Sequence, residues 1–199
     1  MPESSAALLR AAGYAAFLII PLLTASGIAL WLFFDGAGAI FGSINDLLVA
    51  ICLGLMVLPV LALRSIVGTQ AGPWFDVVSG LALAGLALAA AGQVLLVAGG
   101  IALETSFVTG GVGILPVLAW AIAIAILALR VGALPNQLGW ATVALLAMIV
   151  VASLGSAVLP PAGIVVLSVA LLTILVGWLA IIGSTCLAGV ASGPIPASP

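Results

Sequence analysis

Two long apolar runs joined by a short turn constrain this chain more than any other feature of its sequence. The first run ends at Arg130 and the second extends from Trp140 to Leu159, and Arg130 is the only charged residue between Pro116 and Leu159. About 20 consecutive apolar residues in a helix cross the roughly 30 Å hydrocarbon core of a bilayer. Similar runs recur along the whole sequence, so the pattern predicts a chain that crosses a membrane several times.

The composition argues against a water-soluble domain. Of the 199 residues, 66% are hydrophobic and only 4% are charged, whereas soluble domains carry about a quarter charged residues. A backbone in lipid must satisfy its own hydrogen bonds, which leaves helices or closed barrels, and barrel strands alternate in segments of about ten residues. The continuous apolar runs therefore predict an all-α bundle. The basic residues form no patch, which argues against binding of nucleic acid.

The apolar runs divide into six predicted spans within one transmembrane domain over residues 1–190, followed by a disordered tail at 191–199. The first run is too long for the apolar region of a signal peptide, so we expect it to be retained as a span. Asn45 or Asp46 is expected to cap the second span, and a loop rich in glycine, serine and threonine is expected at 105–111. The six spans are expected at about 11–34, 46–64, 77–103, 112–130, 140–159 and 162–190.

The three basic residues orient this topology. With six spans, Arg10, Arg64 and Arg130 all fall on one side of the membrane, and basic residues favour the cytoplasmic side. We therefore expect both termini in the cytoplasm of a multi-pass protein of the cell membrane. The arginines are interpreted as topology anchors whose side chains reach the lipid surface, with lipid head-group binding as the alternative. Asp76 lies on the same side and could pair with either Arg64 or Arg130.

Small residues follow one face of the third predicted span and one face of the fourth. Such faces let membrane helices approach closely, because lipid provides no hydrophobic drive for helix association. We expect the third span to pack on the fourth and to be the most buried helix. These residues are interpreted as packing contacts and not as a cofactor site: Gly85, Ala89 and Gly92 on the third span, and Ala121, Ala125 and Ala128 on the fourth.

Gln93 is the most polar side chain near the middle of any predicted span. Its amide needs a partner in lipid, so the side chain is expected to face the inside of the bundle. Two interpretations stay open. The amide could contact a solute in a central cavity, or it could form an interhelical hydrogen bond that fixes the packing.

The sequence offers few groups for catalysis. It contains no histidine and no lysine, and its five acidic residues fall at predicted span ends or in the N-terminal tail. We therefore expect no catalytic residues, no metal site, no cofactor and no enzymatic activity. Cys52 and Cys186 are expected at depths about 20 Å apart in the membrane, which is too far for a disulfide.

The segment between the fourth and fifth spans resembles small bacterial six-span membrane proteins of unknown function. In that group a basic residue, a Leu/Ile-Pro step and a Leu-Gly pair separate two late spans. The corresponding residues here are Arg130, Leu134-Pro135 and Leu138-Gly139, and the opening AAGYAAFLII is also similar. The chain has fewer basic residues around this turn than such proteins usually show. The resemblance implies a six-span topology and no particular activity.

These features favour a non-catalytic integral membrane protein, an accessory or scaffold subunit that packs with other membrane proteins. The alternative is a transporter or channel for a small neutral or apolar solute, in which Gln93 and three prolines mark a cavity between broken helices: Pro21, Pro59 and Pro116. A lipid-modifying membrane enzyme is the least favoured class, because no nucleophile–base pair is visible. The expected partners are membrane lipids, and other membrane proteins or further copies of the chain.

Overall fold

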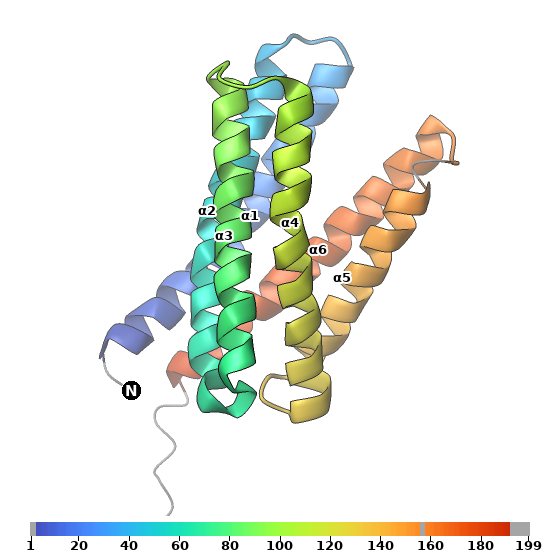
Figure 1. Cartoon of the computed structure of the whole chain (residues 1–199). Coiled ribbons are helices and arrows are strands. Elements are labelled where there is room, and N and C mark those ends of the chain that lie inside the picture. The colour runs from blue at the N-terminus through green and yellow to red at the C-terminus, as the bar shows by residue number, and fades with distance from the viewer. Residues whose placement is uncertain (1–2, 156–157, 192–199) are drawn as a thin grey trace, which may run out of the picture.

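The structure is a computed structural model that describes residues 3–155 and 158–191, and these residues form six long α-helices and no β-strand (Figure 1). All six helices are long and apolar enough to cross a membrane. The predicted all-α, six-span bundle is therefore confirmed. The helices are α1 (Glu3–Phe34), α2 (Ile40–Val67), α3 (Pro73–Val97), α4 (Leu103–Ile126), α5 (Asn136–Gly155) and α6 (Pro161–Ala191).

The six helices form a ring. Each helix packs against its neighbours in the chain, and α6 closes the ring by packing on α1. The start of α1 and the end of α6 lie at the same end of the bundle, which we call the terminal end (Figure 1). The α2–α3 and α4–α5 connections also lie there, and the other three connections lie at the opposite end.

Two short helical turns shape the connections at the terminal end. A 3-10 turn, η1 (Gly68–Ala71), follows α2, and a π-helical turn, η2 (Leu127–Val131), continues α4. The π turn closes with a hydrogen bond of 3.0 Å from the Ala133 N–H to the Leu127 carbonyl oxygen. Gly132 follows at φ +71°, a left-handed conformation that glycine adopts without steric cost.

The connection between α3 and α4 differs from the sequence prediction. Helix α3 ends at Val97 and not near residue 103, because Gly99 turns the chain at φ +70°. Helix α4 begins at Leu103, so residues 105–111, predicted as a loop, are helical. Serine and threonine favour loops when their hydroxyls bond to non-helical backbone. Here the Thr109 hydroxyl instead donates to the Ser106 carbonyl oxygen within the helix, at 3.1 Å.

Other helix ends also lie outside the predicted spans. Helix α2 begins at Ile40, so Asn45 and Asp46 lie inside it, and the predicted cap is wrong. A proline occupies the first position of α3 and of α6, where its missing N–H costs no helical hydrogen bond. Of the predicted tail, residue 191 ends α6, and 192–199 lie outside the described residues.

The most buried helix is α4 and not α3. We compared the most apolar 18-residue stretch of each helix. The buried share of residues is 44% in α4 with its π-helical extension, 39% in α2 and 28% in α3. Helix α4 is more buried because it also reaches α6. The Trp120 ring of α4 meets the Trp178 ring of α6 edge to face, with centroids 6.5 Å apart.

Helices α5 and α6 form a hairpin that leans away from the other four helices toward the opposite end (Figure 1). Close contact between α4 and α5 occurs at the terminal end. A Cβ atom placed on Gly139 would lie 2.6 Å from Leu129 Cγ and 2.9 Å from Ala128 Cβ. The hairpin is thus held at its base and exposed along its outer half.

Candidate functional site

A cavity of about 260 Å³ lies at the centre of the ring, and all six helices contribute to its wall. The wall exposes no polar surface to the cavity. Its lower part, toward the terminal end, includes Met56 of α2 and Trp178 of α6. Its upper rim includes Leu23 of α1, Val49 of α2 and Ile114 of α4. This is the concave, apolar kind of space that small-molecule sites use.

The lower wall of the cavity is held in place by a buried polar contact. The Trp178 indole N–H donates to the Thr142 hydroxyl at 2.8 Å, and this hydroxyl donates to the Leu138 carbonyl oxygen at 2.7 Å. Both side chains are buried. Trp120, which packs against Trp178, has no acceptor for its own indole N–H among the described residues. Trp178 is therefore fixed by a hydrogen bond, and Trp120 by packing alone.

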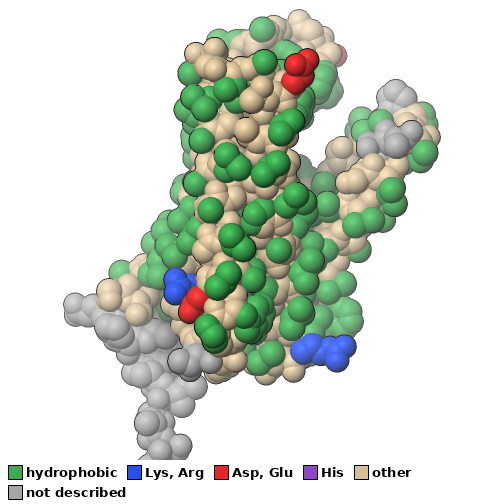
Figure 2. All heavy atoms as spheres, in the orientation of Figure 1, with side chains coloured by type: hydrophobic (Ala, Val, Ile, Leu, Met, Phe, Trp, Pro, Cys, Tyr) green, Lys and Arg blue, Asp and Glu red, His purple; other side chains and the backbone are tan. Residues whose placement is uncertain are grey.

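The cavity faces lipid on the side where α4 and the hairpin diverge. Ile114 on its rim is 37% exposed, and Leu146 and Ile149 of α5 are half-buried. Figure 2 shows the hairpin standing away from the body of the molecule, with hydrophobic side chains on the surfaces either side of the gap. An apolar molecule in the bilayer can thus approach the cavity sideways.

Polar side chains lie beyond the upper rim of the cavity. The Ser26 hydroxyl donates to Asn45 Oδ1 at 2.6 Å, and Asn45 Nδ2 donates to Asp46 Oδ1 at 3.1 Å. Ser26 follows Leu23 by three residues, and Asn45 precedes Val49 by four. At these spacings they continue the helix faces that line the cavity. This contact joins α1 to α2 about one helical turn above the apolar wall.

Gln93 lies at the same level, nearer a helix end than the sequence predicted. It is four residues from the end of α3, because that helix stops at Val97. Arg64 of α2 pairs with Asp76 of α3, so these two positions are at about the same height. Counting 17 residues from each of them toward the opposite end reaches Leu47 on α2 and Gln93 on α3. Gln93 is therefore level with Asn45 and Asp46. We call Ser26, Asn45, Asp46 and Gln93 the polar layer.

The Gln93 amide is unpaired. Its side chain is half-buried and points toward α4, where a Cβ on Gly110 would lie 4.0 Å from Gln93 Nε2. Across residues 3–155 and 158–191 it has no hydrogen-bond partner, so the interhelical bond considered from the sequence is not formed. Gln93 follows Leu86, a cavity residue, by seven positions, which places both on one face of α3.

The three arginines lie toward the terminal end, and one of them is paired. Arg64 Nε lies 2.6 Å from Asp76 Oδ1, and the two side chains are 47% and 53% exposed. The Arg10 Nε–H donates to the Ala6 carbonyl oxygen at 3.4 Å. Arg130 has neither an ion pair nor a hydrogen-bonded side-chain partner within the described ranges. Of the two pairings open from the sequence, Asp76 forms the one with Arg64.

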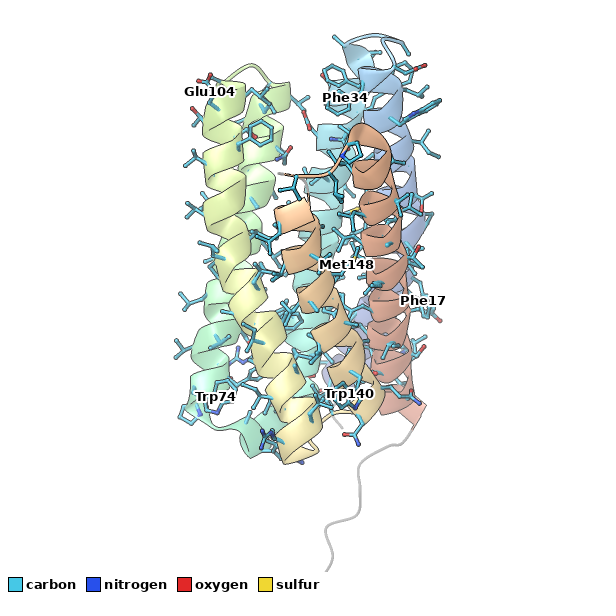
Figure 3. The ribbon with its side chains drawn as sticks, turned by 90° about the vertical axis from the view of Figure 1, so that its right-hand side faces the viewer. Phe17, Phe34, Trp74, Glu104, Trp140 and Met148 are labelled. Atoms are coloured by element: carbon cyan, nitrogen blue, oxygen red, sulfur yellow. The ribbon has the colours of Figure 1, made fainter. Side chains whose placement is uncertain are left out.

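Aromatic side chains mark the two ends. Figure 3 shows Trp74 and Trp140 at the terminal end, and Phe34 with Glu104 at the opposite end. Trp74, Trp140 and Phe34 are exposed. Tryptophan side chains are enriched at the boundaries between membrane and water, so the membrane boundary is expected close to the terminal end of the bundle.

The small-residue face of α3 packs on α4, as predicted. A Cβ on Gly85 would overlap the Gly113 carbonyl oxygen, and one on Gly92 would lie 2.5 Å from the Thr109 hydroxyl. The matching face of α4 is different from the prediction and includes Thr109, Gly113 and Pro116.

The three predicted alanines of α4 are buried, but they do not form the face that meets Gly85 and Gly92. Ala121 lines the cavity, Ala125 is buried, and Ala128 lies against the Gly139 position of α5. Five residues rotate a helix by about 140°, so Ala121 points well away from Pro116. Ala89 of α3 does contact α4, 3.0 Å from a Cβ placed on Gly113.

The prolines do not interrupt the helices, and the two cysteines are not joined by a disulfide. Pro21, Pro59 and Pro116 lie inside continuous helices, so the helices are not broken as the transport alternative expected. Membrane helices tolerate such prolines when nearby polar groups or local changes in helix geometry satisfy the freed backbone carbonyls. Cys52 and Cys186 are both free and buried. No cluster of three or more potential metal ligands occurs among the described residues.

No protein-family model matches the chain. No curated protein is significantly similar to it, and no solved structure matches it. The fold and the cavity therefore define the class on their own: an all-α, multi-pass membrane protein with an apolar central cavity.

Proposed function

We propose that the chain is a non-catalytic integral membrane protein that holds a small apolar molecule in its central cavity. The observation that carries this proposal is the wholly apolar wall to which all six helices contribute. An enclosed apolar space of about 150 Å³ stays dry and binds molecules the size of benzene. A cavity of about 260 Å³ has room for a larger apolar molecule. We call the molecule bound in the cavity the guest.

The position of the charged groups supports binding over ion-coupled transport. Ion-coupled carriers generally place ionisable groups near the middle of the membrane. Within the described residues the cavity wall contains no acidic or basic side chain, and the charged side chains there lie toward the helix ends. The guest is therefore expected to be neutral where it contacts the wall.

We base the proposed orientation on the arginines and the proposed location on the resemblance to other proteins. Basic residues favour the cytoplasmic side, so the terminal end, with both termini, is placed in the cytoplasm and the polar layer toward the outside. The membrane is the cell membrane, in keeping with the resemblance to small bacterial six-span proteins. The unpaired Arg130 is the arginine best placed to contact a lipid head group, since Arg64 already has a carboxylate partner.

A role as an accessory subunit is the second candidate, and the hairpin favours it. Only 22% of the most apolar window of α5 and 11% of that of α6 is buried. Exposed Leu154 and Val166 lie on its outer half. Another membrane protein or a second copy of the chain could cover these faces. Purification from the native membrane in mild detergent separates the candidates, because a subunit travels with fixed partners and a carrier of apolar molecules travels alone.

Binding can be tested with a brominated alkane, which quenches the fluorescence of a nearby tryptophan. Trp178 lines the cavity, so bromododecane should quench the purified protein in a saturable manner. Ala121→Phe fills the cavity and should abolish saturable quenching. Ala119→Phe places the same ring on the exposed side of α4 and should leave it unchanged. Equal quenching of both folded variants would contradict binding in the cavity.

A further inference from the structure

We propose that the guest is a single-chain amphiphile with a neutral, hydroxyl-bearing head, whose tail fills the apolar cavity and whose head bonds to Gln93 in the polar layer. This inference rests on the proposed function, because it names the ligand class of the same cavity. It goes further in assigning the specificity of the site to one side chain outside the cavity wall.

An apolar cavity alone provides little selectivity in a bilayer. Lipid tails are as apolar as leucine side chains, so a hydrocarbon guest gains no hydrophobic free energy when it leaves the bilayer. Filling the cavity restores the dispersion contacts that an empty space lacks, but any chain that fits can do this. A preference for one class of molecule must therefore come from polar groups at the edge of the cavity.

Gln93 is the polar group in the right place. It lies on the same face of α3 as Leu86, seven residues further toward the opposite end. At a rise of about 1.5 Å per residue this is roughly 10 Å further along α3 than Leu86. Asn45, by contrast, already accepts from Ser26 and donates to Asp46. The Gln93 amide is free to bond to a guest.

The chemistry of an amide favours a hydroxyl head. An amide offers a carbonyl acceptor and N–H donors. One hydroxyl group can therefore donate to Gln93 Oε1 and accept from Gln93 Nε2, either directly or with a water between the hydroxyl and the amide. Neither group of the Gln93 amide is bonded to another described residue, so both are available to a bound head.

Charge argues against an anionic head. Asp46 belongs to the polar layer, and Glu104 lies in the first turn of α4 at the same end. The arginines lie toward the terminal end, on the far side of the cavity from this layer. A carboxylate or phosphate next to Gln93 would therefore meet like charge without a basic partner. The free group itself is uncharged, which points to a neutral head.

The test compares chains that differ only in the head: dodecane, dodecanol, dodecanoate and dodecylamine. Each of the four compounds is used to displace bromododecane from the full-length protein in the same detergent. The recovery of tryptophan fluorescence measures the displacement. Dodecanol should bind about three- to tenfold more tightly than dodecane, the range expected for one hydrogen bond in a membrane protein. Gln93→Leu should remove this preference and keep dodecane binding. Gln137→Leu, the same change at an exposed position of α5, should retain it.

The remaining outcomes separate this inference from the proposed function. If dodecane and dodecanol bind equally and Ala121→Phe blocks both, the hydroxyl head is refuted and the apolar cavity site stands. A preference for dodecanoate or dodecylamine over dodecanol overturns the neutral head in the same way. If no chain binds in a saturable manner, both the inference and the proposed function fail. A preference that survives in Gln93→Leu overturns the role of Gln93.

Discussion

The indole nitrogen of Trp178 on α6 donates a hydrogen bond to the hydroxyl of Thr142 on α5, 2.8 Å away. This contact lies below the cavity and joins the two helices of the hairpin at a buried position. The same threonine bonds to its own helix through the Leu138 carbonyl oxygen. The hydroxyl thus serves as both acceptor and donor, and the orientation of the Trp178 ring in the cavity wall depends on it.

Replacement of Thr142 should loosen this wall. Thr142→Val keeps the shape of the side chain but leaves the buried Trp178 N–H without an acceptor, which costs about 1–3 kcal/mol. We expect a lower midpoint of thermal unfolding in detergent and weaker quenching by bromododecane. Thr173→Val on α6 removes an exposed hydroxyl that bonds only to its own helix and should change little. Equal effects of the two replacements would contradict a special role for the Trp178–Thr142 bond.

The contact between α3 and α4 should tolerate no side chain at Gly85. A Cβ there overlaps the backbone oxygen of Gly113, and backbone cannot move aside as a flexible side chain can. Gly85→Ala should therefore destabilise the bundle by about 1–3 kcal/mol. Gly80→Ala on the same helix meets open space and should be neutral or stabilise by up to about 1 kcal/mol. Thermal unfolding of the two variants in the same detergent gives the comparison.

The orientation of the chain should be visible by cysteine labelling in intact cells. In a background with Cys52→Ala and Cys186→Ala, we expect an impermeant maleimide to label Gly36→Cys, at the opposite end. Gly132→Cys, beside Arg130, should react only after the membrane is opened. Both glycines have positive φ and open space around Cβ, so the two changes impose comparable strain. The reverse pattern of labelling would place the termini outside.

The exposed ion pair between Arg64 and Asp76 should contribute little to stability. Its side chains are about half exposed, and such pairs are worth at most about 1 kcal/mol. Asp76→Asn is therefore expected to shift the unfolding midpoint only slightly, and less so at high salt. A large loss of stability would show that this pair holds the α2–α3 connection together.

The number of helices and the packing face of α3 could be predicted from the sequence because both depend on local patterns. Apolar runs of membrane length give the helices, and the spacing of Gly85, Ala89 and Gly92 gives the face. The matching face of α4 could not be predicted in this way. Alanine is common all around that helix, and its contacts depend on the rotation that brings Gly113 opposite Gly85.

A central cavity was one alternative considered from the sequence, but the residues of its wall and of the polar layer were not predictable, because they come from helices far apart in the chain. Gln93 stood out as an isolated amide, but its true height depended on where α3 ends. Gly99 and Gly100 carry that signal, since two glycines after an apolar run favour a helix end. Ser26 and Asn45 gave no sign of pairing, because the α1–α2 register is set by the whole length of two helices.

Helix α6 has 31 residues, which at about 1.5 Å each is roughly 46 Å of helix in a hydrocarbon layer of about 30 Å. It therefore cannot stand upright without pushing apolar side chains into water, and it crosses the ring obliquely (Figure 1). Tilting is how long membrane helices answer such a mismatch. The width of the lateral opening beside α4 is consequently coupled to bilayer thickness: a thinner membrane tips the hairpin outward, and a thicker one brings it upright against its neighbours.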